Sequence, residues 1–245
     1  MRINSINNIS YKSLSTANLV LEAGGEKKSD KKNAIKVGVA SAVGSLVGLS
    51  IPFLLIRKKQ GLNIPKGALK ELNFSEKIGK IWKSSNIDYN LPEILSISTG
   101  SLLGGLLGGV LVDKNKDHRK EKVEEALHTF NNILIPTTLT DILLKTTKKA
   151  KIKSPIDKII SPIIGIGVGM VLANKVTNKI TKKFIDPDMP ERKQQLKDYF
   201  VHIDDILGVL VLTKIPFADK IQAGKLLTAV YAYCGFKAGI GHKHD

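Results

Sequence analysis

The chain has 245 residues, of which 42% are hydrophobic and 24% charged, and its formal net charge is +16. A nucleic-acid-binding protein of this charge would gather its basic residues in one stripe with aromatic residues between them. Here Lys and Arg flank every apolar block, and aromatic residues make up only 5% of the chain. The composition therefore argues against a nucleic acid partner and favours contact between cationic side chains and the anionic headgroups of a lipid bilayer.

Residues 1–34 are predicted to form a disordered polar and basic tail. Their one apolar run, Leu19 to Leu21, is too short for the core of a signal peptide, and a transit peptide is the lesser alternative. Cys234 is the sole cysteine, which excludes an intrachain disulfide and a cysteine-rich metal site.

Residues 35–114 are predicted to form a first membrane unit with two spans, 37–56 and 94–112. Neither run contains a charged residue. A helix of about 20 residues is about 30 Å long, which matches the hydrocarbon thickness of a bilayer. Both runs therefore predict transmembrane helices.

The segment between these spans, residues 67–83, has apolar side chains at three- and four-residue spacing opposite a row of lysines. This pattern predicts a cationic amphipathic helix that lies in the membrane interface with an aromatic anchor. A connecting helix packed on the protein is the alternative. The predicted interface residues are Lys77, Lys80, Trp82 and Lys83.

Two further helical hairpins are predicted in residues 115–178 and 188–241, followed by a short tail at 242–245. Residues 159–173 form the clearest span of this half, whereas 126–144, 206–213 and 226–236 are weaker because they are short or hold polar residues. In the second of these hairpins, Asp188 can cap a helix whose first residue is Pro190.

A small residue stands at every fourth position of each clear span. Lipid gives no hydrophobic drive for helix association, so helix backbones must approach closely, which small residues permit. We expect these positions to be helix-packing faces, within the chain or with further copies in a homo-oligomer. The expected packing residues are Gly44, Gly48, Gly100, Gly104, Gly108, Ser161, Gly165 and Gly169.

The regularly spaced small residues also indicate an internal repeat. An offset of 61 residues aligns Gly100 with Ser161, Gly104 with Gly165 and Gly108 with Gly169. We interpret the chain as repeated hairpins of small-residue helices, with chance similarity as the alternative. Repeated hairpins often place a site at the repeat interface.

Polar residues precede two of the proline turns in similar order. Ionisable and polar groups at membrane depth usually face a bundle interior or a watery cavity and mark solute paths. The alternative places them at helix starts near the headgroups. The candidate polar site consists of His128, Asn131, Asn132, His202, Asp204 and Asp205.

No catalytic signature is present in the sequence. It holds no nucleophile elbow, phosphate-binding loop or zinc-ligand spacing, and its glycine clusters lie within apolar runs. Glu125 and His128 have the spacing of one half of a di-iron site but lack a second copy. We therefore expect no enzyme, no cofactor and no metal.

These patterns predict an all-α fold, a polytopic bundle of membrane helices. If six spans place both termini on one side, that side holds 21 and the other 17 of the 38 Lys and Arg residues, which leaves the orientation open. The expected role is a structural, scaffold or membrane-organising component. A channel or transporter for an ion or small polar solute is the alternative, and an adaptor that uses its lysines is a third.

Overall fold

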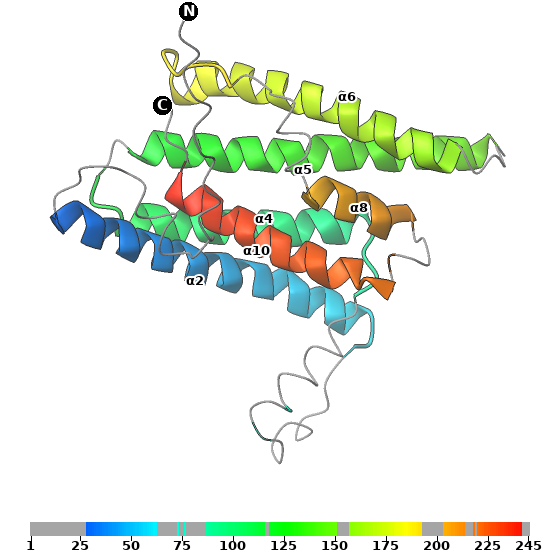
Figure 1. Cartoon of the computed structure of the whole chain (residues 1–245), viewed down its shortest axis with the longest axis horizontal. Helices are drawn as coiled ribbons and strands as arrows, with labels where there is room; N and C mark the ends of the chain where they lie inside the picture. The colour runs from blue at the N-terminus through cyan, green and yellow to red at the C-terminus, as the bar shows by residue number, and fades with distance from the viewer. Residues whose placement is uncertain are drawn as a thin grey trace, which may run out of the picture.

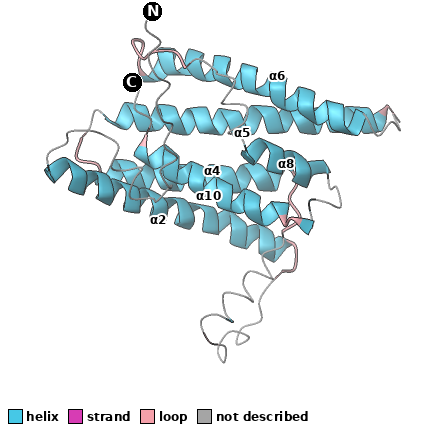
Figure 2. Ribbon diagram, viewed as in Figure 1, coloured by secondary structure: helices cyan, strands magenta, loops and turns pink. Residues whose placement is uncertain are grey.

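The structure is a computed structural model that describes residues 28–62, 73, 76, 87–115, 118–150, 157–192, 203–213, 218 and 220–241. Throughout these ranges the regular elements are helices, with no strand (Figure 2). They are α2 (Lys28–Lys59), α4 (Leu91–Val112), α5 (His118–Lys149), α6 (Asp157–Ile180) with the π-helical turn η1 (Thr181–Ile185), α8 (Ile203–Thr213) and α10 (Ala223–Ile240).

Three of these helices are long and apolar enough to cross a membrane. Each contains an 18-residue window of high mean hydropathy, 2.1 in Lys31–Lys59, 1.7 in Leu91–Val112 and 1.5 in Ile160–Ile185. For the residues that the structure describes, the prediction of an all-helical fold with such helices is confirmed. The weaker runs at 126–144, 206–213 and 226–236 lie in α5, α8 and α10. These helices are not among the three that are long and apolar enough to cross a membrane.

The helices form a bundle in which α2, α4 and α10 pack together and α5 pairs with α6 (Figure 1). Helix α8 contacts both α5 and α10, and α6 lies at the outer edge of the bundle with α5 between it and the other helices (Figure 1). Successive helices alternate in direction, so the start of α2 and the end of α10 lie at the same end of the bundle (Figure 1).

The contact between α2 and α4 is made by backbone against backbone at glycines. A Cβ atom at Gly48 would lie only 3.0 Å from the Gly100 carbonyl carbon and 3.0 Å from the Gly104 Cα. A Cβ atom at Gly44 would overlap the Gly104 carbonyl oxygen, and one at Gly108 would overlap the backbone of α2. Any larger side chain at these positions would hold the two helices apart.

Helix α4 has a second glycine face, which packs on α10. A Cβ atom at Gly105 would lie 3.1 Å from the Gly235 Cα, and one at Gly109 would lie 2.8 Å from the Gly239 Cα. Because α4 has glycines on its faces toward both α2 and α10, it packs closely against both helices.

Glycines of α6 pack on α5 in the same manner. A Cβ atom at Gly165 would lie 2.8 Å from the Thr140 Cα, and one at Gly169 would lie 2.9 Å from the Pro136 nitrogen. Ser161, on the same row of α6, has its hydroxyl oxygen 3.2 Å from the Thr147 hydroxyl. These contacts place α5 and α6 side by side along most of their length.

Beside an apolar core that includes Ile94, Ile97 and Leu227, the bundle carries small polar side chains inside and large apolar side chains outside. Small polar residues are fully buried between the helices: Ser41, Ser45, Ser98, Ser101, Thr140 and Thr177. Large apolar residues cover the outward faces of the long helices, among them Val39, Val43, Val47, Ile51, Leu55, Leu103, Leu107, Leu111, Ile163, Ile164 and Val168.

The prediction that a helix begins at Pro190 is wrong, because Pro190, Glu191 and Arg192 are not helical. The peptide groups of Arg192 bond to α6 instead: Asn178 Oδ1 accepts its N–H at 3.2 Å, and Asn174 Nδ2 donates to its carbonyl at 3.0 Å. These side-chain bonds hold the chain against α6 in a non-helical conformation.

The segment predicted as an interfacial helix, 67–83, lies outside the described residues except at Asn73 and Glu76. Glu76 N–H donates to Asn73 Oδ1 at 2.9 Å, and Asn73 N–H donates to Glu76 Oε2 at 3.0 Å. Reciprocal bonds of this kind form a capping box at a helix start. The interfacial role of the segment and the internal repeat stay predictions.

Candidate functional site at the polar end of the bundle

One end of the bundle holds two groups of buried, paired charges. The start of α2, the end of α4, the start of α5, the end of η1 and the end of α10 meet there (Figure 1). We call this end, which carries Asn33, Asp113, Lys122, Arg192 and Lys237, the polar end. The alternating direction of the helices brings these residues together although they are far apart in the sequence.

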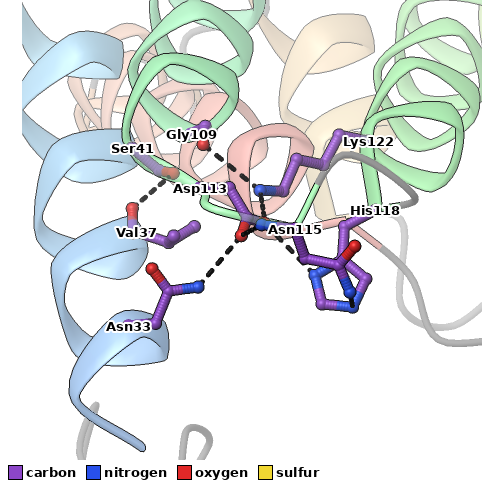
Figure 3. Close-up of polar contacts among 8 residues, drawn as sticks. All are labelled: Asn33, Val37, Ser41, Gly109, Asp113, Asn115, His118 and Lys122. Carbon is purple, nitrogen blue, oxygen red and sulfur yellow. Dashed lines mark hydrogen bonds and ion pairs between the residues drawn. The ribbon is translucent and has the colours of Figure 1, made fainter. Parts of the chain in front are cut away.

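Asp113, the residue after the last turn of α4, is the centre of a hydrogen-bonded cluster (Figure 3). Its carboxylate accepts bonds from Lys122 Nζ of α5 and from Asn33 Nδ2 of α2, the latter at 3.0 Å. The backbone N–H of Asn115 donates to the same carboxylate at 3.0 Å, and His118 Nδ1 lies 3.2 Å from it. The cluster therefore joins α2, α4 and α5.

The ion pair in this cluster is shielded from water. The side chains of Lys122 and Asp113 are only 1% and 3% exposed. Lys122 Nζ also donates to the Gly109 carbonyl at 3.2 Å, so its ammonium group satisfies a carbonyl at the end of α4 as well. A Cβ atom on Gly241 would lie 3.1 Å from Lys122 Cγ, which places the end of α10 against the same side chain.

Two opposing effects set the pKa of Asp113. Burial raises it, but the hydrogen bonds from Lys122, the Asn115 N–H and Asn33, together with the Lys122 charge, lower it well below its ordinary range. The carboxylate is therefore the favoured form in the folded protein.

A second buried ionic group lies where the chain leaves η1. Arg192 Nη2 donates to Glu124 Oε2 at 2.8 Å and also to Glu125 Oε2. The side chains of Glu124 and Glu125 are 2% and 4% exposed. Lys237 Nζ of α10 lies 3.6 Å from Glu125 Oε1. Arg192 thus joins α5 to α6, and Glu125 joins α5 to α10.

The pKa of Glu125 is also lowered on balance. Burial acts to raise it, while the charge of Arg192, the charge of Lys237, the hydrogen bond from Arg192 and the charge of His128 lower it. The cations hold the buried carboxylate in its ionised form.

Three residues of the sequence-predicted polar site lie on α5, one to two turns further into the bundle. Asn131 Nδ2 donates to Thr177 Oγ1 of α6 at 2.9 Å, and Asn132 Nδ2 lies 3.3 Å from His128 Nε2. Asn131 and Asn132 are both 5% exposed. The oxygen Asn132 Oδ1 is buried without a partner among the described residues.

The other half of the predicted site is only partly described. His202 lies outside the described residues, and Asp204 and Asp205 belong to the first turn of α8 with their side chains not described. The predicted interface residues Lys77, Lys80, Trp82 and Lys83 also lie outside the described residues. Both assignments stay predictions.

The sequence interpretation missed the Asp113 and Arg192 groups. A local signal existed for Asp113, because an acid directly after an apolar run and a lysine nine residues later can meet across a short turn. No local signal existed for Asn33, which is 80 residues away from Asp113. Arg192 lies 67 and 68 residues from its two carboxylates.

The geometry of this end is suited to holding helices together. Each buried ion pair joins different helices, and each carboxylate is already engaged by cations or amide donors. Among the described residues there is no group of three metal-ligating side chains. A crevice too narrow to hold a water molecule lies further along α5 and is lined by Pro136, Thr137, Thr140, Ile166, Val209 and Leu212.

Comparison with known proteins finds no relative: no protein-family model matches the chain, and no curated protein or solved structure matches it.

Proposed function

We propose that the chain is an integral, multi-pass membrane protein that acts as a structural, scaffold or membrane-organising component. One observation carries the proposal: the outward faces of the three long apolar helices carry large hydrophobic side chains, while hydroxyl and ionic groups lie between the helices. A bilayer is the solvent in which this distribution is stable, because lipid covers the apolar surface and every buried polar group must find a partner inside.

Helix α2 gives the sharpest form of this contrast. Val47 and Leu55 on its outward face are 59% and 64% exposed, whereas Ser41 and Ser45 on its inner face are fully buried. In water each exposed side chain of this size would forgo about 1.5–3 kcal/mol of burial free energy. An apolar face that covers several turns of helix would drive aggregation of a soluble protein. In a bilayer the same face costs nothing.

A structural role is supported by how the polar groups are used. The ion pairs at the polar end and the hydroxyls of Ser45 and Ser101 bond to neighbouring helices, and α4 has small residues on the faces toward both α2 and α10. Such contacts give a rigid, closely packed bundle. Rigidity and close packing are what a scaffold in a membrane needs.

The experiment is extraction of cell membranes with alkaline carbonate, followed by size-exclusion chromatography of the detergent-solubilised protein. The proposal predicts that the protein stays in the membrane pellet and gives one sharp chromatographic species. Gly104→Leu is expected to broaden that species, because Gly104 contacts the backbone of α2. Gly167→Leu is the matched control, since no atom lies within 4 Å of the position of its added Cβ atom. Release of the wild-type protein by carbonate would refute membrane integration.

A second candidate function is passage of an ion or small polar solute along α5. It is favoured by two buried oxygens without a partner among the described residues, Asn132 Oδ1 and Thr140 Oγ1, which lie two helical turns apart on α5. Groups of this kind inside a membrane can mark a solute path. Reconstitution into liposomes tests it: solute flux that is lost on Asp204→Asn with Asp205→Asn supports transport, and the absence of any wild-type flux counts against it.

A further inference from the structure

The outward face of α6 changes character along its length. Its first four turns carry exposed apolar residues, among them Ile164, Val168 and Leu172. Its last turns carry exposed lysines on the same face, Lys175 and Lys179. These five positions are spaced three or four residues apart, so they form one continuous stripe on the helix surface.

The inner face of α6 becomes polar at the same level. Asn174 and Asn178 bond to the Arg192 backbone, and Thr177 accepts a bond from Asn131. The outer stripe is therefore apolar before Asn174 and basic after it, and the inner face after it carries Thr177 and Asn178. Where a helix changes in this way, the hydrocarbon of the bilayer ends and the headgroup region begins.

The exposed lysines of α6 and η1, like those near the start of α2, differ from five cations of the polar end that are already engaged. Lys120, Lys122, Lys182, Arg192 and Lys237 each pair with a carboxylate. No carboxylate among the described residues pairs with Lys175, Lys179 or Lys183. Their charges are therefore available to an external anion.

An exposed aromatic side chain completes this surface. Phe184 in the π-helical turn η1 is 72% exposed, and Lys183 Nζ lies 5.0 Å from the centre of its ring. An exposed aromatic ring beside cations at the end of an apolar helix is typical of the boundary between acyl chains and headgroups. Since α6 lies at the outer edge of the bundle, no other described helix covers this face (Figure 1).

We propose that Lys175, Lys179, Lys183 and Phe184 form a binding surface for anionic phospholipids in the leaflet at the polar end. The lipid acyl chains lie along Ile164, Val168 and Leu172, and the lysines bind the headgroup phosphate. The proposal rests on the proposed membrane integration and adds to it a leaflet, a face of the protein and a class of lipid.

The span length of α6 strengthens the assignment. Between Lys158 and Lys175 lie 16 uncharged residues, which as a helix extend over about 24 Å, less than the hydrocarbon thickness of about 30 Å. Lysine stems can bridge such a difference by extending their ammonium groups to the headgroups. Headgroups are thereby drawn toward α6 at Lys175 and Lys179.

The test uses a tryptophan reporter in the full chain. Trp82 is the only tryptophan, so Trp82→Phe with Phe184→Trp gives a single fluorophore at the proposed surface. The protein is reconstituted in phosphatidylcholine vesicles that contain a minor fraction of brominated phosphatidylglycerol, or the same fraction of brominated phosphatidylcholine. We expect the phosphatidylglycerol to quench at least about threefold more, and the difference to shrink at high salt.

Two matched triple variants locate the effect. Lys175→Gln, Lys179→Gln and Lys183→Gln together are expected to abolish the preference. Lys31→Gln, Lys32→Gln and Lys36→Gln remove the same charge from exposed positions near the start of α2, at the same end of the bundle, and are expected to preserve it.

The outcomes separate this proposal from the one on which it rests. Equal quenching by both brominated lipids would overturn the lipid preference while leaving membrane integration intact. Loss of the preference in both triple variants would also overturn the assignment to α6. Quenching by neither lipid would overturn membrane integration and this proposal together. Displacement of the phosphatidylglycerol by excess inorganic phosphate would show a site for soluble phosphate and contradict lipid binding.

Discussion

The hydroxyl oxygens of Ser45 on α2 and Ser101 on α4 lie 2.8 Å apart where α2, α4 and α10 pack together. Ser45 Oγ lies 2.6 Å from the Ala232 carbonyl oxygen of α10, and Ser101 Oγ lies 2.6 Å from the Tyr231 carbonyl oxygen, so the two hydroxyl protons serve three contacts. The two hydroxyls thus link three helices at one point. They reach α10 because Gly235 has no Cβ atom, and the Ser101 carbonyl and hydroxyl occupy the space that a Cβ atom would fill.

Gly235→Ala is therefore expected to destabilise the protein by about 1–3 kcal/mol, the range for adding a methyl group to a closely packed contact. Gly167→Ala is the control, because its methyl group would meet open space. There the gain in helix propensity predicts a neutral or slightly stabilising effect. Thermal unfolding in detergent, followed by circular dichroism, measures both. Equal unfolding temperatures for the two variants would argue against close packing at Gly235.

Lys122→Met is expected to cost about 3–5 kcal/mol, because it leaves the Asp113 carboxylate buried without its cation. Lys120→Met is the control on the same helix, α5. It breaks an exposed ion pair with Asp186 and is expected to cost about 1 kcal/mol or less. Chemical unfolding in mixed micelles gives both values. The double variant Lys122→Met with Asp113→Leu should recover part of the loss, and a double variant as unstable as the sum of both single changes would contradict the pairing.

The Asp113 cluster also predicts a loss of stability in acid. A carboxyl group whose pKa is lowered by folding stabilises the folded state above its ordinary pKa of 3.8, and this contribution is lost as the pH falls below that value. The wild-type protein should therefore lose stability below about pH 4, and Asp113→Asn should flatten that dependence. Unfolding temperatures across an acid pH series measure the effect. An unchanged acid profile in the variant would show that Asp113 does not contribute.

Arg192→Gln is expected to weaken the attachment of the chain after η1 and to leave Glu124 and Glu125 without their main cation. The loss of stability should be larger at neutral pH than in mild acid. Without the Arg192 charge, which lowers its pKa, Glu125 can take up a proton in mild acid and so avoid a buried unpaired charge. Lys182→Gln, which breaks an exposed pair with Glu191, is the control. Limited proteolysis after Asp186 reports the detachment, and equal cleavage of both variants would contradict the role of Arg192.

The sequence was sufficient for the helices that hydropathy defines. The run 37–56 lies within α2 and the run 94–112 within α4, because uninterrupted apolar residues of that length form helices whatever their partners are. The small residues of α4 could be assigned to a packing face but not to a partner. Which side of α4 meets α2 and which meets α10 depends on Gly235 and Gly239, more than a hundred residues away.

The ionic groups could not be read from the sequence for a related reason. Arg192 follows a proline turn that resembles a helix start, but bonds from Asn174 and Asn178 hold its backbone in another conformation. Local turn chemistry favours a helix there, and tertiary hydrogen bonds override it. The Asp113 cluster likewise receives one hydrogen bond from Asn33, which lies on α2, 80 residues earlier in the chain.

The central claim is that the outward apolar faces lie in lipid, and a spin label on α2 tests it most directly. In a Cys234→Ala background, Val47→Cys places the label on the outward face, and Lys58→Cys places it in the last turn of the helix. In reconstituted bilayers the account predicts that the label at position 47 is relaxed strongly by oxygen and weakly by a water-soluble nickel chelate, with the reverse at position 58. Strong relaxation by the nickel chelate at position 47 would contradict the claim.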